Sequence, residues 1–304
     1  MNYEESLMVK ASWYYYFENM TQQAIADRLN ISRMRVIKLL DNAQKMNIIQ
    51  FHLRSDGIGM LEQSRKLMEK YQLKDVFIVP DATEPAHLNE AIARAGAMYI
   101  ADRLGSNACI NVGYGDTLSR TLNHLATMVE TPVTCISLTG GVSYYLPNGS
   151  SNVFNAKLCL IPAPLLVSSP DMAVAMMNES SVSDLLRMTQ LASFTLVGIG
   201  SMNEDATVIK SGVISQNDFL YLKMKNAVGD VLCHFFDSEG KLIASPIEDR
   251  LIATSLEQLK AMPNVIGLAA GPKKVEAIHS ALVGGYLDVL ISDESTVAAL
   301  LEQY

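Results

Sequence analysis

Two glycine-rich segments have the residue types and spacing that could bind a charged small molecule. Gly113-Tyr114-Gly115-Asp116-Thr117 follows an apolar run and precedes a stretch with helical spacing, and Thr139-Gly140-Gly141 follows the next apolar run. Glycines let the backbone approach an anion, and a helix N-terminus with a nearby hydroxyl favours phosphate. The spacing differs from the GxGxxG and Walker patterns, so neither a dinucleotide nor a nucleoside triphosphate site is expected. Glycine turns after strands are common, so both segments could also be ordinary turns.

Two charged residues elsewhere could complete such a site. Lys274, in Gly271-Pro272-Lys273-Lys274 at the start of a predicted helix, could neutralise a phosphate. Asp230, in Gly229-Asp230 just before an apolar run, could accept hydrogen bonds from sugar hydroxyls. The simpler interpretations are an exposed lysine at a helix start and a turn residue that hydrogen-bonds its own backbone.

A layered α/β fold would bring these loops together. From about residue 75 onward, short apolar runs alternate with segments of helical spacing, and several runs are apolar throughout, as in a parallel sheet covered on both faces. Ligands of such folds bind at the carboxyl ends of the strands. The predicted strands are Val76–Val79, Cys109–Val112, Val133–Leu138, Leu158–Ile161, Phe194–Ile199, Val231–Phe235, Val265–Ala269 and Val289–Ile291.

The N-terminal part of the chain has helical periodicity and no alternating strand pattern before residue 45. Between residues 22 and 41, the periodicity is interrupted by the polar break Asn30-Ile31-Ser32, which indicates two helices and a tight turn. Thr21 and Ser32 can cap the N-termini of these helices, and Asn30 can adopt a left-handed conformation. Ala26 is small where the two helices must approach. This pattern predicts a helix-turn-helix.

Basic residues concentrate in the same region although the whole chain is acidic. The 304 residues contain 24 Lys+Arg and 32 Asp+Glu, a formal charge of −8, but between residues 28 and 54 Asp41 is the only acidic residue. A local basic patch is typical of nucleic-acid binding, although charge alone would also fit a solvated helix face. The spacing and the caps favour DNA. The basic residues of this region are Arg28, Arg33, Arg35, Lys38, Lys45 and Arg54.

The second helix of this pair is the predicted recognition helix. The residues at the start of such a helix face base edges in the major groove. Arg33 could contact guanine, whereas Arg35 and Lys38 could equally lie along phosphates, and the sequence does not separate these roles. The predicted DNA-binding residues are Thr21, Gln22, Ser32, Arg33, Met34, Arg35 and Lys38.

We expect a DNA-binding domain over residues 1–55, a connecting helix over 56–73, and an effector-binding and oligomerisation domain over 74–304. Residues 47–53 alternate like the short strand of a winged arrangement. The apolar stripe of the connecting helix could pair with a second chain or pack onto the neighbouring domain. The segment Val9–Phe17, with Trp13 and three tyrosines, is expected to be a packing helix whose aromatic residues make core and dimer contacts.

Taken together and in order, these motifs resemble the SorC family of bacterial sugar-responsive transcriptional regulators, close to the branch that includes the Lsr operon repressor. The resemblance covers nearly the whole chain. After the helix-turn-helix it rests on GYGDT, TGG, IPAPL at 161–165, VGIG at 197–200, KSGVIS at 210–215, AVGD at 227–230 and AGPKK ending at Lys274.

The resemblance implies a DNA-binding domain joined to a Rossmann-like parallel-sheet domain related in fold to ribose-5-phosphate isomerase and glucosamine-6-phosphate deaminase. It also implies dimers or tetramers, and a phosphorylated sugar or polyol as effector. The chain departs from the family at Val36-Ile37-Lys38, where Val-Ser-Arg is frequent, and at Ala270-Gly271, where two glycines are frequent. Carried onto this sequence, the phosphate site falls on Gly113, Gly115, Asp116, Thr117, Thr139, Gly140, Gly141 and Lys274, with Asp230 facing the sugar.

The expected function is that of a DNA-binding transcriptional regulator, a repressor of a sugar or polyol operon, whose binding to double-stranded operator DNA is controlled by a phosphorylated sugar. The alternative is a sugar-phosphate isomerase or deaminase with an appended helical domain. Asp116, Asp205 and Asp230 are available carboxylates, and His234 lies near one of them, but the spacing forces no acid–base pair. We therefore expect no catalytic residues and no enzyme.

The four cysteines form no CxxC pair, and each lies in an apolar run. This pattern is typical of reduced thiols in a cytoplasmic protein and offers no metal or disulfide framework, so neither a metal nor a cofactor is expected. No secretory signal and no transmembrane helix are expected, because glycines, prolines and polar residues interrupt the longest uncharged stretch.

Overall fold

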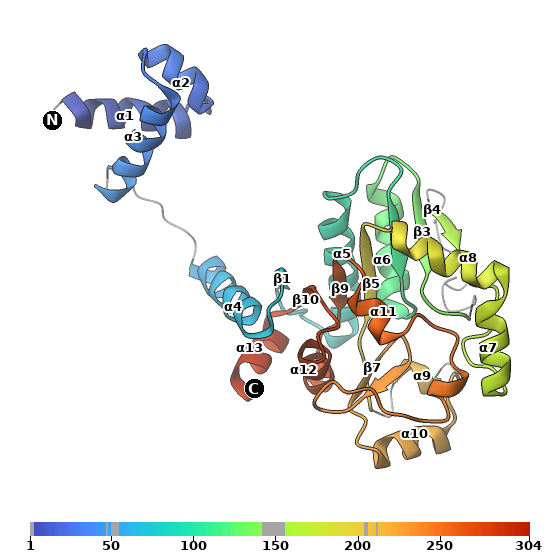
Figure 1. Ribbon diagram of the computed structural model, residues 1–304. Coiled ribbons are helices and arrows are strands. Elements are labelled where there is room, and N and C mark those ends of the chain that lie inside the picture. The colour runs from blue at the N-terminus through green and yellow to red at the C-terminus, as the bar shows by residue number, and fades with distance from the viewer. Residues whose placement is uncertain (1–2, 47, 50–54, 142–155, 204–205, 211) are drawn as a thin grey trace. The chain divides into compact units, whose positions relative to one another are not determined.

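The computed structural model describes residues 3–46, 48–49, 55–141, 156–203, 206–210 and 212–304 (Figure 1). The chain forms two compact units, Met1–Ile58 and Gly59–Tyr304. The helix α4 (Ser55–Tyr71) covers most of residues 56–73, for which the sequence predicts a connecting helix.

The first unit contains α1 (Tyr3–Tyr16), α2 (Gln22–Leu29) and α3 (Arg33–Lys45), packed around one apolar core. Each helix contributes side chains from one face, because apolar residues recur at helical spacing. Tyr14, Tyr15 and Tyr16 pack against this core, whereas Trp13 and Phe17 are exposed and stack on each other. The core consists of Leu7, Met8, Ala11, Ile25, Ala26, Val36, Leu39, Leu40 and Ala43.

Local hydrogen bonds fix the turn between α2 and α3. The Thr21 hydroxyl accepts from the backbone N–H of Ala24 at 3.2 Å, and the Ser32 hydroxyl accepts from that of Arg35 at 3.2 Å. Each bond satisfies a donor that has no partner inside its helix. Asn30 ends α2 in the left-handed conformation, with φ 53° and ψ 48°. The predicted helix-turn-helix, with both caps and its turn residue, is confirmed. The predicted wing strand falls largely on residues 47 and 50–54, which lie outside the described residues.

A seven-stranded parallel sheet forms the centre of the second unit, in the order β1-β10-β9-β5-β2-β3-β4. Seven of the eight predicted strands are confirmed within a residue or two at their ends. The strands are β1 (Asp75–Val79), β2 (Cys109–Val112), β3 (Val133–Ser137), β4 (Ala156–Cys159), β5 (Phe194–Gly198), β9 (Val265–Leu268) and β10 (Val289–Asp293).

The eighth predicted strand, Val231–Phe235, is wrong. The chain turns back in the middle of it, so β7 (Gly229–Val231) and β8 (His234–Phe236) form an antiparallel hairpin that joins β6 (Gly200–Ser201) in a separate three-stranded sheet. Leu232 and Cys233 make the turn with φ values of 56° and 66°. Turns of this kind usually contain Asn or Gly, and this one has neither, which is why its apolar sequence concealed it.

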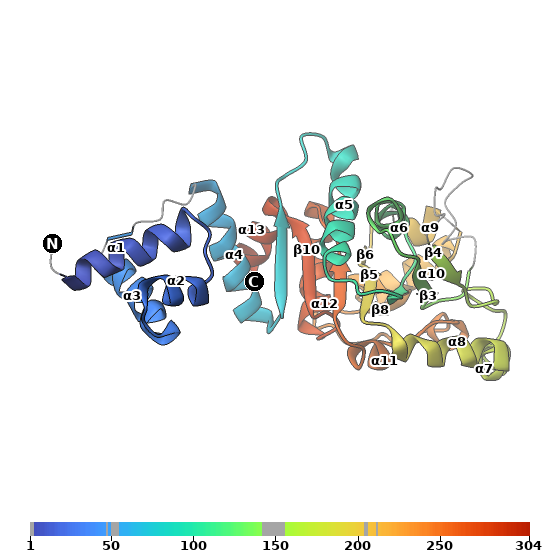
Figure 2. The same ribbon diagram turned by 90° about the horizontal axis from the view of Figure 1, so that it is seen from above.

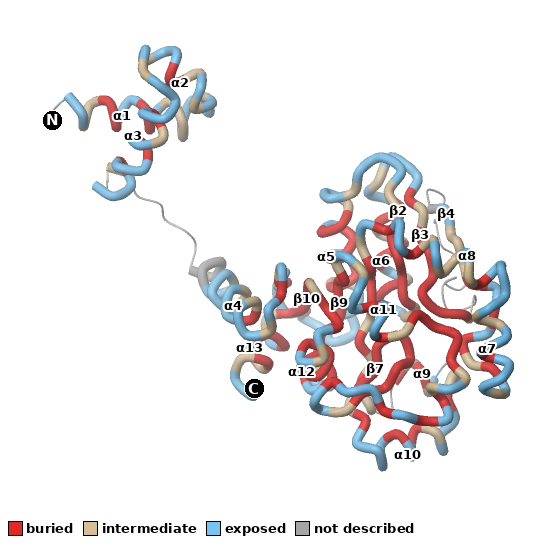
Figure 3. Tube along the Cα trace, viewed as in Figure 1, coloured by how far each residue is buried: buried red, intermediate tan, exposed pale blue. Residues whose placement is uncertain are grey.

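Helices cover both faces of the large sheet, as the continuous apolar strands require. On one face α5 (Leu88–Ala101) and α6 (Asp116–Met128) pack against Leu196, whereas α4, α11 (Leu256–Lys260), α12 (Val275–Val283) and α13 (Glu294–Gln303) pack on the other face against Val197 (Figure 2). The strands between these layers are mostly buried (Figure 3). The remaining elements are α7 (Pro170–Asn178), α8 (Ser180–Met188), α9 (Thr207–Lys210), α10 (Gln216–Met224), η1 (Pro85–His87), η3 (Thr189–Leu191), η4 (Glu248–Arg250) and η5 (Pro272–Lys274).

All four cysteines are free thiols, of which Cys135 and Cys233 are buried and Cys109 and Cys159 partly buried. Burial raises the pKa of the Cys135 thiol to about 12, which keeps it protonated and unreactive. Within the part of the chain that the structure describes, no helix is long and apolar enough to span a membrane.

Candidate functional site

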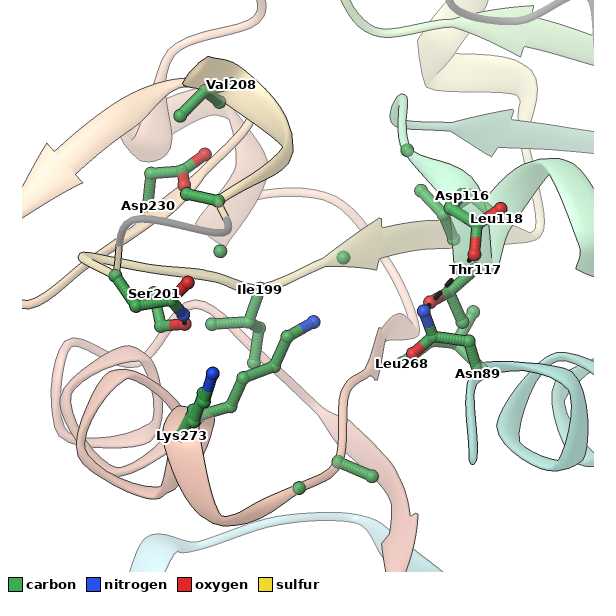
Figure 4. A pocket seen from close by; sticks show the side chains of 18 of the residues that line it. Asn89, Asp116, Thr117, Leu118, Ile199, Ser201, Val208, Asp230, Leu268 and Lys273 are labelled. Carbon is green, nitrogen blue, oxygen red and sulfur yellow. Dashed lines mark hydrogen bonds between the residues drawn. The ribbon is translucent and has the colours of Figure 1, made fainter. Parts of the chain in front are cut away.

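A cavity of about 400 Å³ opens at the carboxyl ends of β2, β5 and β9 (Figure 4). Its volume lies in the usual range for small-molecule sites. The segments that follow these strands, Tyr114–Leu118, Gly198–Ser201 and Ala270–Lys274, form most of the wall. The β7–β8 hairpin adds Asp230 and Leu232. The parallel sheet thus gathers loops that are more than 150 residues apart in the sequence.

The N-terminus of α6 supplies one wall of the cavity. Gly115 precedes the helix with φ 130° and ψ 163°, and no side chain caps it. A Cβ on Gly115 would meet nothing within 4 Å, so glycine is required here for its φ and not for space. The N–H groups of Asp116, Thr117 and Leu118 come first in the helix and have no intrahelical acceptor. This end of the cavity therefore favours an anion.

Asp230 lies on the opposite side of the cavity from Asp116 and Thr117 (Figure 4). The side chain is only 6% exposed, and one carboxylate oxygen accepts the backbone N–H of Cys233 at 3.1 Å. Burial raises the pKa of Asp230 to about 6, although this hydrogen bond and the electrostatic effects of Lys274 and His234 oppose the shift. Asp230 is a buried carboxyl that a hydroxyl-bearing ligand could stabilise in its charged form.

Lys274 supplies a positive charge to the same cavity. Burial lowers the pKa of its ammonium group, while the carboxylates of Asp230 and Asp116 oppose this effect. Neither Lys274 nor Asp230 forms an ion pair with a described residue. Both groups therefore remain available to a ligand that carries a negative charge and hydroxyl groups.

A polar network holds Asp116 at the mouth of the cavity. Arg120 Nε donates to both carboxylate oxygens of Asp116, at 3.0 and 2.9 Å, and Asn89 Nδ2 donates to one of them at 3.2 Å. Arg120 also donates to Glu90 at 2.7 Å, and this hydrogen bond is the main cause of a lowered Glu90 pKa. His124 contacts the same Glu90 carboxylate at 2.7 Å. The positive charge of Arg120 offsets the negative charge of the Asp116 carboxylate. An anion that approaches the start of α6 is therefore repelled less by Asp116.

The structure brings together Gly115, Asp116, Thr117, Asp230 and Lys274 of the predicted effector site. The other four predicted residues, Gly113, Thr139, Gly140 and Gly141, do not line the cavity. Backbone N–H groups of three of them are already used: Gly113 donates to Leu196, Gly140 to Ile252 and Gly141 to Ala163, each at 2.8 Å.

Close packing explains why the buried TGG segment, Thr139-Gly140-Gly141, has glycine at residue 140. Thr139 is 1% exposed and pairs with Ala253 in an isolated bridge, and a Cβ on Gly140 would collide with the carbonyl oxygens of Ala163 and Pro164. Sequence reasoning missed several lining residues: Asn89, Ser201, Asn203, Leu232 and Lys273. Ser201 and Asn203 come directly after VGIG, so their position after a strand was the signal that could have found them.

The predicted DNA-binding residues lie on the first unit, at the starts of α2 and α3. Thr21 and the five predicted residues of the α3 segment are exposed, with Met34 at 63%, whereas Gln22 is partly buried. A groove lined by Tyr15, Tyr16 and residues 19–23 reaches Arg33. A helix start with exposed basic residues can face a duplex without rearrangement.

Ion pairs distinguish the basic residues of this unit. Arg35 pairs with Glu4 of α1 at 3.2 Å, and Arg28 pairs with Glu18 at 2.9 Å while its guanidinium lies over the Tyr14 ring. Lys45 pairs with Asp41. Arg33 and Lys38 form no ion pair with a described residue. Among the basic residues predicted to bind DNA, these two are therefore the ones that no ion pair holds away from an anionic partner.

Comparison with known proteins gives matches over both units. A family described as "Putative sugar-binding domain" matches residues 55–302, and "Sigma-70, region 4" matches residues 10–45. The transcriptional regulator LsrR of Klebsiella pneumoniae is 31% identical and that of Escherichia coli K12 34% identical, each over 302 residues. These alignments cover 98% of this chain and 93% and 95% of the two relatives.

Solved structures show the same fold. The full-length sorbitol operon regulator SorC from Klebsiella pneumoniae has a TM-score of 0.71 and 23% sequence identity. The match covers 99% of this chain and 100% of that one.

Proposed function

The chain belongs to the SorC family of sugar-responsive transcriptional regulators, and from this premise we propose that a phosphorylated sugar bound in the 400 Å³ cavity controls its binding to operator DNA. Its full-length relatives carry names of transcriptional regulators, and it has a helix-turn-helix. The chain is therefore a DNA-binding regulator of sugar operons and not an enzyme.

One observation carries the proposed effector: an anion-binding helix start and Lys274 share a cavity with the buried carboxyl of Asp230. The phosphate accepts hydrogen bonds from the first N–H groups of α6 and the Thr117 hydroxyl, and Lys274 neutralises its charge. Sugar hydroxyls donate to Asp230. A ligand with one anionic end and one hydroxyl-bearing end satisfies both sides, which neither a plain sugar nor inorganic phosphate does.

On the DNA side, Arg33 and Lys38 are the basic residues that we propose contact the operator directly. Ser32 and Met34 lie beside them at the start of α3, and Thr21 and Gln22 flank the same groove. Arg35 contributes if its pair with Glu4 opens. A dimer or tetramer would place two such helices in successive major grooves, about 34 Å apart, on a pseudo-palindromic site.

Regulation requires the effector to bind with unequal affinity to two states of the protein, one that binds DNA and one that does not. Moving a population from 1:99 to 99:1 takes a difference of about 5.5 kcal/mol in binding free energy between the states. We propose that the DNA-competent state is the one without effector, so that the protein acts as a repressor in the cytoplasm. The sugar-phosphate releases it from a sugar or polyol operon.

Fluorescence anisotropy with the purified full chain and DNA from its own upstream region tests this function. We expect a phosphorylated sugar to lower the affinity for DNA, and the same sugar without phosphate to have no effect. Lys274→Ala should shift the response to a sugar-phosphate concentration about ten- to a hundredfold higher while leaving basal DNA binding unchanged. Lys260→Ala, at an exposed lysine outside the cavity, should respond as the natural chain does.

Two results would contradict the proposal. The first is equal DNA affinity with and without every sugar phosphate of a broad panel. The second is turnover of a sugar phosphate by a chain that does not bind DNA, which would favour the isomerase or deaminase alternative.

A further inference from the structure

One helix of the second unit, α12, is connected to both charged groups of the proposed effector site. Lys274 occupies the N-cap position of α12. The same helix packs on β7, the strand that carries Asp230 (Figure 1). This packing is close, because a Cβ on Gly229, next to Asp230, would lie 2.6 Å from the Cβ of Ala277 in α12. A ligand that binds Lys274 and Asp230 therefore acts on α12 at its start and along its side.

Another side of α12 contacts the helix that leads to the DNA-binding unit. His279 Nδ1 and the hydroxyl of Tyr71 form a hydrogen bond of 2.7 Å, and Tyr71 is the last residue of α4. The boundary between the two units falls after Ile58, within α4, so the chain passes from one unit to the other through this helix. His279 comes five residues after Lys274, which is about 7.5 Å along the helix axis. One short helix thus joins the effector lysine to α4.

Tight packing surrounds the contact between α12 and α4. Ile278 and Ala281 of α12 and Leu67 of α4 are fully buried and belong to one apolar core. An interior packed in this way has low compressibility and transmits a displacement instead of absorbing it. A shift of α12 at the effector site therefore reaches the side chains that hold the end of α4.

The hydrogen bond between Tyr71 and His279 joins two neutral groups. Burial lowers the pKa of His279, and the charge of Lys70 acts in the same direction. Burial raises the pKa of Tyr71 to about 12, and Tyr304 adds to this shift. The ring of Tyr304 stacks on that of His279, with 3.6 Å between the ring centroids. A hydrogen bond weakens steeply as its geometry departs from the optimum, so this contact is sensitive to a small movement of either helix.

We propose that the contact between Tyr71 and His279 makes α4 follow α12, so that these two positioning residues transmit the effector's binding to the DNA-binding unit. This inference rests on the proposed function, in which a phosphate binds Lys274 at the start of α12. Neither Tyr71 nor His279 is among the described residues that line the cavity, and neither belongs to the first unit. Removing their contact therefore affects the coupling between effector and DNA, and not the binding of either one alone.

Fluorescence anisotropy with the full chain and DNA from its own upstream region tests the proposal. The measured quantity is the ratio of the DNA dissociation constants with and without a saturating sugar phosphate. The probes are D-ribose 5-phosphate, D-glucose 6-phosphate, D-fructose 6-phosphate and glycerol 3-phosphate. Tyr71→Phe removes only the hydroxyl and should lower this ratio about two- to tenfold, the contribution of one hydrogen bond. Its DNA affinity without sugar phosphate should equal that of the natural chain.

Variants of the partner residue and a matched control sharpen the test. His279→Leu should lower the ratio as Tyr71→Phe does, and the double variant should lower it no further, because both changes remove the same contact. His279→Asn keeps a hydrogen-bonding group at the position of Nδ1 and should retain more of the ratio than His279→Leu. Tyr99→Phe is the control, because the Tyr99 hydroxyl donates to Asp75 at 2.8 Å within the core on the other face of the sheet. It should leave the ratio unchanged.

Calorimetry without DNA shows whether each variant still binds the sugar phosphate, and thermal denaturation shows whether it is folded. A contact that only stabilises the fold would lower the melting temperature and leave the ratio at its natural value. That result would overturn the inference while the proposed function stands. Loss of sugar-phosphate binding in Tyr71→Phe, or an equal fall of the ratio in Tyr99→Phe, would also overturn it. If no probe changes the DNA affinity of the natural chain, the proposed function itself fails, and this inference fails with it.

Discussion

Replacing the buried carboxyl of Asp230 with an amide should change how stability depends on pH. Asp230→Asn removes the charge and retains an oxygen that can accept the Cys233 N–H. The pKa of Asp230 is raised from 3.8 to about 6, mainly by burial. One unit of pKa corresponds to about 1.4 kcal/mol, so ionising this group in the folded chain costs about 3 kcal/mol more than in the unfolded chain.

The sign follows from proton binding. Below about pH 4 the carboxyl of Asp230 is protonated in both states, and it imposes no penalty. Between about pH 4 and pH 6 the folded chain holds its proton while the unfolded chain releases it, so stability falls as the pH rises. Above about pH 6 the full penalty of about 3 kcal/mol applies. Asp230→Asn should therefore match the natural chain near pH 4 and be more stable at pH 7.

Chemical denaturation at several pH values between 4 and 7 measures this difference. Circular dichroism is the suitable signal, because the single tryptophan, Trp13, lies in the first unit and does not report on the second. Subtracting the natural chain from the variant cancels the other titrating groups. Asp102→Asn, at an exposed carboxylate without a described hydrogen-bond partner, is the matched control. A difference that does not change with pH, or a variant less stable at pH 7, would refute the assignment of Asp230 as a buried, destabilised carboxyl.

Four further substitutions test the two sites and their supports. Lys274→Ala should weaken sugar-phosphate binding by about ten- to a hundredfold in calorimetry, the range expected for a hydrogen bond to a charged group; unchanged affinity would remove Lys274 from the site. Gly115→Ala should lower the unfolding free energy by about 1–3 kcal/mol, because its φ of 130° strains any other residue, and should also weaken effector binding. Arg33→Ala should cost about 1–3 kcal/mol of operator affinity in anisotropy titrations, whereas Arg28→Ala, whose guanidinium is held by Glu18, should cost less; equal effects would contradict the assignment. Ser32→Ala should destabilise the first unit by about 1 kcal/mol in thermal melts followed by tryptophan fluorescence, because it removes the α3 cap.

Much of the fold could be predicted from the sequence because local interactions determine it. Thr21 and Ser32 cap helices through donors three residues away, and Asn30 turns the chain by its own conformation. Strands buried on both faces read as continuous apolar runs, so their positions were recognisable. The hairpin at Leu232-Cys233 was missed because its turn residues carry no turn signal, and packing holds them at positive φ.

The candidate site was only partly predictable. Gly115, Asp116, Thr117, Asp230 and Lys274 meet as expected, but Asn89, in α5, reaches the site only through the packing of α5 on α6. The TGG segment has the composition of an anion-binding loop, yet two of its N–H groups already donate to backbone carbonyls of neighbouring loops, those of Ile252 and Ala163. The composition of a segment shows that it has backbone N–H groups to donate. Only the fold shows which of these groups already donate to another part of the chain.

The sequence by itself determined the helix-turn-helix, the parallel sheet and the order of the ligand-binding loops, because caps, turns and hydrophobic periodicity act over a few residues. Only the tertiary structure decided which charges remain free and how far each is buried. Arg35 meets Glu4 and Asp230 faces Lys274 across long stretches of chain. Burial and electrostatic coupling depend on distances in space, which spacing along the sequence does not set.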